Sequence, residues 1–112
     1  MADTLRSDGN AVEVAAPNAG VSKGTPILSD GFHGIAMHDA ASGETVAIEI
    51  AQREHELNVG GVTAAKGDIL YITTANVISN TNTNRAFFKV TVAKDSNNIA
   101  WGILLPQGAE SV

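Results

Sequence analysis

The sequence lacks cysteine altogether, which excludes disulfide bonds, thiolate metal sites and cysteine nucleophiles. Aromatic residues are scarce, with one Trp, one Tyr and three Phe among 112 residues. Runs of about 18 apolar residues, the length that a membrane-spanning helix needs, do not occur. Residues 1–10 also lack the apolar centre of a signal peptide. We therefore expect one small domain with an aliphatic core, no disulfide bond and no membrane association.

Basic residues are few, with seven Lys and Arg against twelve Asp and Glu, and they lie scattered along the chain. The net charge is −5. Binding to DNA or RNA requires basic side chains concentrated on one face, because phosphate neutralisation supplies most of the affinity. The sequence therefore predicts no nucleic-acid partner, whereas an acidic surface suits a soluble protein that binds another protein.

Short segments in which apolar and polar residues alternate fill most of the chain, and turn-forming residues separate them. The clearest segment places Val46, Ile48 and Ile50 on one face. No segment has the spacing of an amphipathic helix. The expected strands span residues 11–16, 25–29, 32–38, 44–51, 54–59, 68–74, 86–94 and 99–105, with a short one at 77–78. This pattern predicts a mainly β fold, a small barrel or sandwich of about eight short strands.

Three local features predict how these strands are arranged. Asp30 and Gly31 lie between two apolar segments, as in a two-residue hairpin turn, and Pro26 favours the edge or the start of a strand. The alternation shifts by one residue near Gln52 and Arg53, which indicates a bulge or a corner. The unbroken apolar run at residues 69–72 predicts a strand that is covered on both faces.

The chain divides into one folded unit and two short ends. Residues 1–10 are mostly small and polar, and we interpret them as a flexible N-terminal arm. Residues 11–106 form the β-rich domain. Pro106 ends the last strand, and residues 107–112 form a C-terminal tail.

Motifs of common enzymes are absent from the sequence. The segment at residues 61–67, GVTAAKG, resembles a phosphate-binding loop, but its Lys precedes the Gly, and Asp68 follows where a hydroxyl is required. No Gly-x-Ser-x-Gly elbow occurs. These absences predict a protein that is not an enzyme and that uses no cofactor.

The three histidines do not form a metal-binding pattern. His33 and His38 are five positions apart in an expected strand, so their side chains point to opposite faces. His55 faces away from Glu54 and Glu56 for the same reason. Metal ligands must converge on one point, so we predict no metal site.

The alternating pattern predicts the side-chain directions of two aromatic residues, Trp101 and Phe87. Trp101 shares a face with Ile99, Ile103 and Leu105, and we expect this face to pack in the core. Phe87 has the opposite parity to Phe88, Val90 and Val92, so its side chain is expected to point away from the main core. It then either covers a second core or lies in a subunit contact.

The segment at residues 21–50 resembles a family of small tailed-phage proteins, the capsid decoration or cement proteins. Their pattern opens with Val-x-x-Gly-x-Pro, continues through Gly-x-Ala and an Asp-Ala-Ala-x-Gly-Glu loop, and ends in an alternating strand. The matching residues are Val21, Gly24, Pro26, Gly34, Ala36, Asp39, Ala40, Ala41, Gly43 and Glu44. A later Gly-Asp-x-x-Tyr step corresponds to Gly67, Asp68 and Tyr71. The resemblance covers roughly residues 10–74.

The resemblance implies a structural virion protein similar in role to the decoration protein of phage lambda. It implies a protein that is made in the host bacterial cytoplasm and binds the outer surface of the expanded capsid. The implied partner is the major capsid protein, and the implied assembly is a homotrimer at three-fold positions that stabilises the head. Some members are labelled RecA/RadA-like recombinases, but the missing phosphate-binding loop argues against that activity here.

Two groups of residues are candidates for these contacts. The arm and the first strand are expected to meet the capsid, since an extended segment can add a strand to an exposed sheet edge. The capsid-contact candidates are Thr4, Leu5, Arg6, Ser7, Val12 and Val14. The trimer-interface candidates, chosen because their parity points away from the main core, are Phe32, Tyr71, Phe87 and Thr91.

Two alternatives remain open at this point. One is another β-rich virion component, such as a tail-tube or head-completion subunit. The other is a small ligand-binding or carbohydrate-binding β module, although glycan sites normally use exposed aromatic platforms and this chain has few aromatic residues.

Overall fold

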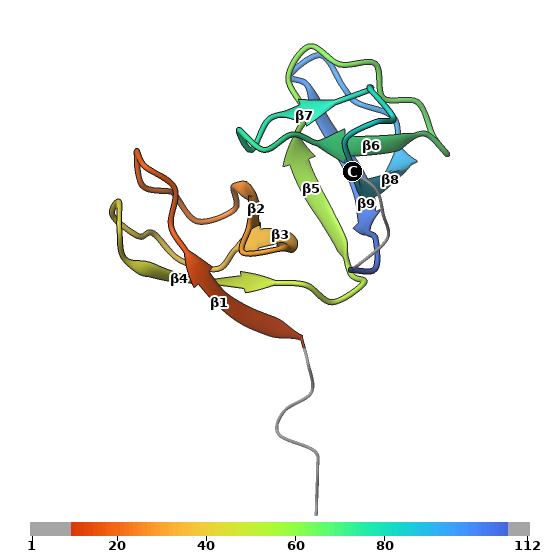
Figure 1. Ribbon diagram of the computed structural model, residues 1–112. Helices are drawn as coiled ribbons and strands as arrows, with labels where there is room; N and C mark the ends of the chain where they lie inside the picture. The colour runs from red at the N-terminus through yellow and green to blue at the C-terminus, as the bar shows by residue number, and fades with distance from the viewer. Residues whose placement is uncertain (1–9, 108–112) are drawn as a thin grey trace, which may run out of the picture.

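The computed structural model describes residues 10–107, which form nine β-strands in two antiparallel sheets and contain no helix (Figure 1). The first sheet has the order β1-β4-β3-β2, from β1 (Ala11–Ala15), β2 (Pro26–Ser29), β3 (Phe32–Ala36) and β4 (Thr45–Glu49). The second has the order β5-β9-β8-β6-β7, from β5 (Glu54–Asn58), β6 (Ile69–Ile72), β7 (Ile78–Ser79), β8 (Arg85–Val92) and β9 (Ile99–Leu104). The second sheet curls into a half-barrel, so the predicted mainly β fold is confirmed.

The chain changes from the four-stranded to the five-stranded sheet at residues 50–53. Before this point Val46 and Ile48 are buried in the first sheet, and after it Leu57 and Val59 are buried in the second. The one-residue shift in the alternation near Gln52 is therefore a corner between two sheets, the second of the two predicted explanations.

The β2–β3 hairpin has the predicted turn. Asp30 and Gly31 both have positive φ angles, 55° and 83°, and Ser29 pairs with Phe32 on either side of them. Two successive positive φ angles define the hairpin turn whose twist matches that of the flanking strands, which explains the Asp-Gly sequence. Pro26 is the first residue of β2, which lies at the edge of its sheet, as its missing N–H requires.

Strand β9 faces the core with its smaller residues. Ala100 and Leu104 are fully buried, whereas Trp101 and Ile103 are 40% and 37% exposed on the outer face of the sheet. The expectation that Trp101 packs in the core is therefore wrong. The reason lies at Gly102, where a Cβ atom would overlap the ring of Phe88. The inner surface of β9 must be shallow to admit that ring, so the larger side chains occupy the outer face.

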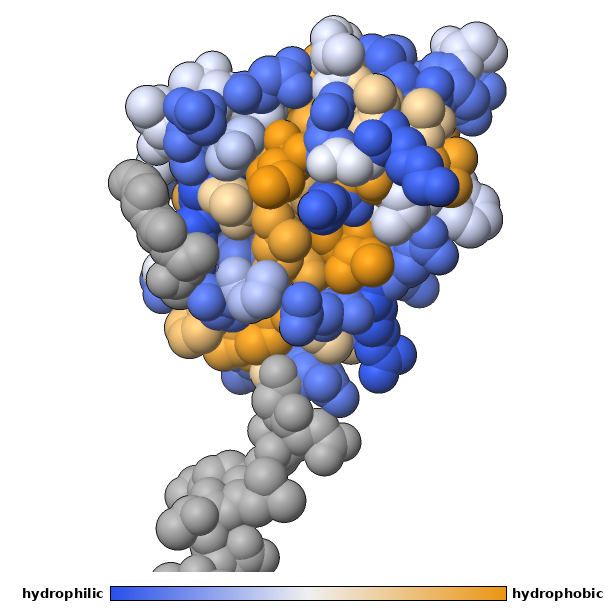
Figure 2. Space-filling model, turned by 90° about the vertical axis from the view of Figure 1, so that its right-hand side faces the viewer, coloured by the Kyte–Doolittle hydropathy of each residue, from blue (hydrophilic) through white to orange (hydrophobic). Residues whose placement is uncertain are grey.

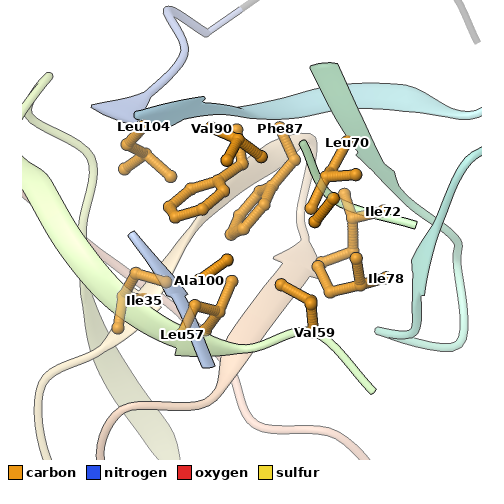
Figure 3. Packing of buried hydrophobic residues seen from close by; sticks show 12 residues of the cluster. Ile35, Leu57, Val59, Leu70, Ile72, Ile78, Phe87, Val90, Ala100 and Leu104 are labelled. Atoms are coloured by element: carbon orange, nitrogen blue, oxygen red, sulfur yellow. The ribbon is translucent and has the colours of Figure 1, made fainter. Parts of the chain in front are cut away.

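The β2–β3 hairpin separates two hydrophobic clusters. Ile27 and Ala36 belong to the cluster of the four-stranded sheet, and Ile35 belongs to that of the five-stranded sheet, with the half-buried Leu28 packed against it. Figure 3 shows Ile35 among side chains contributed by the five-stranded sheet. The hairpin thus contributes side chains to both clusters and lies between them. For this reason residues 33–36 of β3 are all buried.

The strand predicted to be covered on both faces was β6, and this prediction is wrong. Leu70 and Ile72 are fully buried, but Ile69 is 41% exposed and Tyr71 is half-buried, so only one face of β6 meets the core. The strand covered on both faces is β3. Its hydropathy does not indicate this burial, because two of its buried residues, His33 and Gly34, are not hydrophobic.

Phe87 lies in the core, contrary to the prediction from its parity. Both Phe87 and Phe88 are fully buried, with ring centroids 6.0 Å apart (Figure 3 labels Phe87). Leu70 pairs with Phe88 while Tyr71 pairs with Ala86, so Phe87 is the extra residue of a β-bulge. A bulge interrupts the alternation and directs two successive side chains toward the same side of the sheet.

Gln107 joins the end of the chain's described part to β3. Its side-chain Oε1 accepts a hydrogen bond from the His33 backbone N–H at 2.9 Å, and its Nε2 donates to the His33 carbonyl at 2.6 Å. Strand β4 pairs with β3 only at Ile35 and Ala36, so the Gln107 amide occupies the place that β4 leaves. The predicted tail thus begins with a residue bound to the domain, and residues 108–112 lie outside the described residues.

Replacing Gln107 with alanine is expected to lower the free energy of unfolding by about 2 kcal/mol, because two backbone groups of a buried residue lose their partners. Chemical denaturation followed by circular dichroism measures this change. Gln52→Ala, at an exposed glutamine in the corner between the sheets, is the matched control and should change stability by less than about 0.5 kcal/mol. An equal effect of both substitutions would contradict the role given to Gln107.

Candidate functional site

Most of the predicted capsid-contact residues cannot be placed, and the remaining two are in β1. Thr4, Leu5, Arg6 and Ser7 lie outside the described residues. Val14 is buried in the cluster of the four-stranded sheet, and the half-buried Val12 packs against the same cluster. Because both valine side chains face this cluster, a contact made by β1 would use its backbone edge.

Some of the backbone groups on the outer edge of β1 are hydrogen-bonded to side chains of the same chain. Strand β1 bonds to β4 through its even-numbered residues, as the bonds from Ile50 N–H to Asn10 and from Ala16 N–H to Glu44 show. The odd-numbered residues therefore direct their N–H and C=O groups away from the sheet. At Ala15 the N–H donates to Asp30 Oδ2 at 3.0 Å, and the carbonyl accepts from the Ser29 hydroxyl at 2.9 Å.

The part of the β1 edge that precedes Ala15 has no such cover. Within residues 10–107, no hydrogen bond joins the outward backbone groups of Ala11 and Glu13 to another residue. An edge strand with outward N–H and C=O groups can pair with a segment of another chain. Ala11 and Glu13 therefore form a short edge at which a further strand can add.

The four trimer-interface candidates do not lie together. Tyr71 and Thr91 are half-buried on the outer face of the five-stranded sheet, where the Thr91 hydroxyl bonds to Glu54 Oε2 at 2.5 Å. Phe32 is 37% exposed but belongs to β3 in the other sheet. Phe87 is in the core, so its side chain is not available for a subunit contact.

On the outer face of the five-stranded sheet, exposed apolar side chains lie beside charged ones, and Figure 2 shows apolar surface on this side of the molecule. Cross-strand neighbours in the pairing register define two rows of exposed side chains here. We call these two rows the outer sheet face. One row consists of Glu54, Ile103, Lys89 and Ile69, and the other of Glu56, Trp101 and Val92.

Sequence reasoning missed this surface although it grouped part of it correctly. The alternation places Trp101 and Ile103 on one face, but the opposite face, with Ala100 and Leu104, is also apolar. Hydropathy therefore does not say which face is covered. The one signal was Gly102, since a glycine within a strand often marks the close approach of another group.

Ionisable side chains meet at Glu49, whose carboxylate lies 3.1 Å from Arg53 Nε and 3.7 Å from His55 Nε2. Among residues 10–107, no group of three or more His, Asp or Glu side chains is arranged to hold a metal ion. An open groove of about 650 Å³, which extends from Gly20 past Ala41 to Asn76, has no ionisable side chain among its lining residues. In the same range, the structure has no helix of the length and hydropathy needed to cross a membrane.

His33 is the one fully buried ionisable residue in residues 10–107. Its Nε2 lies 2.8 Å from the Leu105 carbonyl, and its ring makes an edge contact with Phe87. Because the Leu105 carbonyl can only accept, Nε2 carries a proton, whereas Nδ1 is buried without a hydrogen-bond partner in residues 10–107. Burial lowers the pKa of His33 below its ordinary value of 6.5, and the charge of Arg85 lowers it further, against the opposing effect of the Leu105 bond.

Because the pKa of His33 is lower in the folded chain, the unfolded chain binds a proton first as the pH falls. His33 is therefore expected to have no effect on the free energy of unfolding well above pH 6.5. The free energy should decrease from about pH 6.5 down to the folded-state pKa and then level off. Denaturation at a series of pH values measures this slope.

The same series on His33→Gln is expected to lose the part of the slope that His33 causes, because glutamine keeps an N–H donor but does not titrate in this range. His38→Gln, at an exposed histidine, is the control and should retain that part. An unchanged slope in His33→Gln would assign the pH dependence to other groups.

A strand edge with outward backbone groups and an exposed apolar sheet face are both suited to binding another protein, and the fold that carries them is a small all-β domain. The chain belongs to the phage cement protein family, whose model matches residues 6–104. No curated protein matches the chain significantly. The resemblance seen in the sequence is confirmed and extends through both sheets. Membership gives the protein a structural role in the virion, bound to the phage capsid.

Proposed function

We propose that the protein binds the outer surface of the expanded phage head as trimers at three-fold positions, and that it stabilises the shell without catalysing a reaction. The observation that carries this proposal is the family match over residues 6–104, which spans both sheets and is not confined to one motif. The net charge of −5 and the scattered basic residues favour the capsid protein over the packaged nucleic acid as the partner.

A trimer would bind the capsid more tightly than a single copy. Three equivalent contacts made at once raise the overall affinity through effective concentration, so each contact can be modest. The site should become available only after expansion brings neighbouring capsid subunits into register. A shell held at each three-fold position by three linked contacts then resists the pressure of packaged DNA.

The contacts are assigned to two parts of the chain. Thr4, Leu5, Arg6 and Ser7, together with β1, meet the capsid, and Val12 and Val14 hold β1 against the four-stranded sheet. The outward backbone groups of Ala11 and Glu13, which have no partner within residues 10–107, support this assignment because they offer an edge for strand addition. Tyr71 and Thr91 contribute to contacts between copies, since they lie on the same face of the five-stranded sheet.

Co-sedimentation with undecorated expanded heads of the same phage tests the proposal, with unexpanded proheads as the control. We expect saturable binding to expanded heads and none to proheads. Decorated heads should also retain their DNA to a higher temperature than undecorated ones. Binding to neither particle, or equal binding to both, would contradict the proposed function.

A further inference from the structure

The outer sheet face carries four of the seven exposed large hydrophobic side chains in residues 10–107. Ile69, Val92, Trp101 and Ile103 come from three adjacent strands and are between 37% and 49% exposed. Figure 2 shows apolar surface gathered at the centre of this side of the molecule, with hydrophilic side chains around it. A contiguous exposed patch with a polar rim is typical of a surface that binds another protein.

The charges on this face restrict what can cover it. Lys89 lies between Ile69 and Ile103, and Glu56 lies beside Trp101. Within residues 10–107, neither charge takes part in an ion pair. A neutral partner would desolvate both charges without compensation, which costs several kcal/mol for each buried ion. The partner must therefore present an acidic group and a basic group beside apolar surface.

The outer sheet face of a second copy would present these groups, since it carries an acidic residue, a basic residue and apolar surface. Glu56 belongs to the edge strand β5 at one margin, whereas Lys89 belongs to β8, on the far side of β9. Glu54 is less available because its carboxylate bonds to Thr91. Because the apolar strand β9 separates Glu56 from Lys89, each of these charges can meet the opposite charge of another copy.

We infer that the outer sheet face packs against the outer sheet face of a neighbouring copy of this chain. Trp101 and Ile103 supply the apolar contact, and Lys89 of one copy pairs with Glu56 of the next. The inference rests on the proposed function only for the number of copies. In a three-fold ring the three outer sheet faces meet around the shared axis, so each copy uses Glu56 toward one neighbour and Lys89 toward the other.

Sedimentation equilibrium of the purified full chain, from about 1 to 200 µM, tests whether copies associate and how tightly. We expect the wild type to associate and Trp101→Ser to weaken association by about 30-fold or more, since a central tryptophan commonly dominates an interface. Val77→Ser is the control, because Val77 is 57% exposed but lines a groove with Pro26 and Asn58, away from the outer sheet face. A monomeric wild type over the whole range would overturn the inference.

A charge exchange tests the pairing directly. Glu56→Lys and Lys89→Glu are each expected to weaken association by about 10-fold, because like charges then meet across the contact. The double variant should return to within about three-fold of the wild type, since each new charge again meets its opposite. Both residues are exposed, and circular dichroism verifies that the variants fold. A double variant as weak as the two single variants would exclude this pairing.

The same variants separate this inference from the proposed function. A wild type that associates but does not bind expanded heads leaves the contact between copies intact and removes the cement role. A monomeric wild type whose Trp101→Ser variant no longer binds heads would place the capsid protein on this face, overturning the inference and supporting the cement role.

Discussion

Phe87→Ala is expected to lower the free energy of unfolding by about 3–5 kcal/mol, the cost of removing a fully buried phenylalanine and leaving a cavity. The ring lies against Phe88 and contacts the edge of His33, so the cavity opens between the five-stranded sheet and the β2–β3 hairpin. Denaturation followed by circular dichroism measures the loss. Because small domains are stable by only about 5–15 kcal/mol, the variant should be close to unfolding at physiological temperature.

Phe32→Ala is the matched control for this experiment. It removes the same side chain from a position that is 37% exposed, so we expect a smaller loss of about 1–2 kcal/mol. The two substitutions also distinguish the structure from the alternating pattern of the sequence, which directs Phe87 away from the core. A small effect at Phe87 would mean that its side chain does not occupy the core.

Gly34→Ala is expected to lower the free energy of unfolding by about 3 kcal/mol through overpacking. A Cβ atom at residue 34 would overlap the backbone oxygen of Glu49 and lie 3.2 Å from the Ile48 Cδ1 atom. The oxygen belongs to the main chain of β4, so no side-chain rotation can relieve the contact. The β3–β4 pair must therefore separate at the point where the chain leaves the four-stranded sheet.

Gly61→Ala provides the comparison for that substitution. No heavy atom lies within 4 Å of a Cβ built at Gly61, and Gly61 is not among the glycines with positive φ. We expect this variant to be as stable as the wild type or more stable by up to about 1 kcal/mol, because alanine reduces the entropy of the unfolded chain. Equal losses at Gly34 and Gly61 would show that the contact with Glu49 is not the cause.

The strands and several of their connections could be predicted because they depend on local patterns. Alternating residues such as Val46 and Ile48 mark a half-buried strand, and Asp30-Gly31 marks a tight hairpin. The shift near Gln52 was visible for the same reason. The family was recognisable from the order of turn residues in the segment at residues 21–50.

The errors concern side-chain direction, which depends on pairing between distant strands. Alternation predicts direction only while no extra residue intervenes, and the bulge at Phe87 is defined by its pairing with β6 and not by its own sequence. Trp101 was assigned to the core because it shares a face with Ile99, Ile103 and Leu105. The opposite face of β9 is also apolar, and only the packing of Phe88 over Gly102 decides which face is covered. The candidate binding surface therefore became visible only in the folded arrangement.

The bond between Gln107 and His33 has a consequence for synthesis of the chain. The partners are 74 positions apart, so β3 leaves the ribosome long before the amide that completes its hydrogen bonds. Until β5 to β9 follow, Leu28 and Ile35 on one side of the hairpin also lack their cover. The nascent first half thus presents an apolar strand pair to solvent, and chaperones bind surfaces of this kind, from which aggregation also begins. The cluster of the five-stranded sheet, which includes Ile35, is therefore expected to close only after residue 107 has been released.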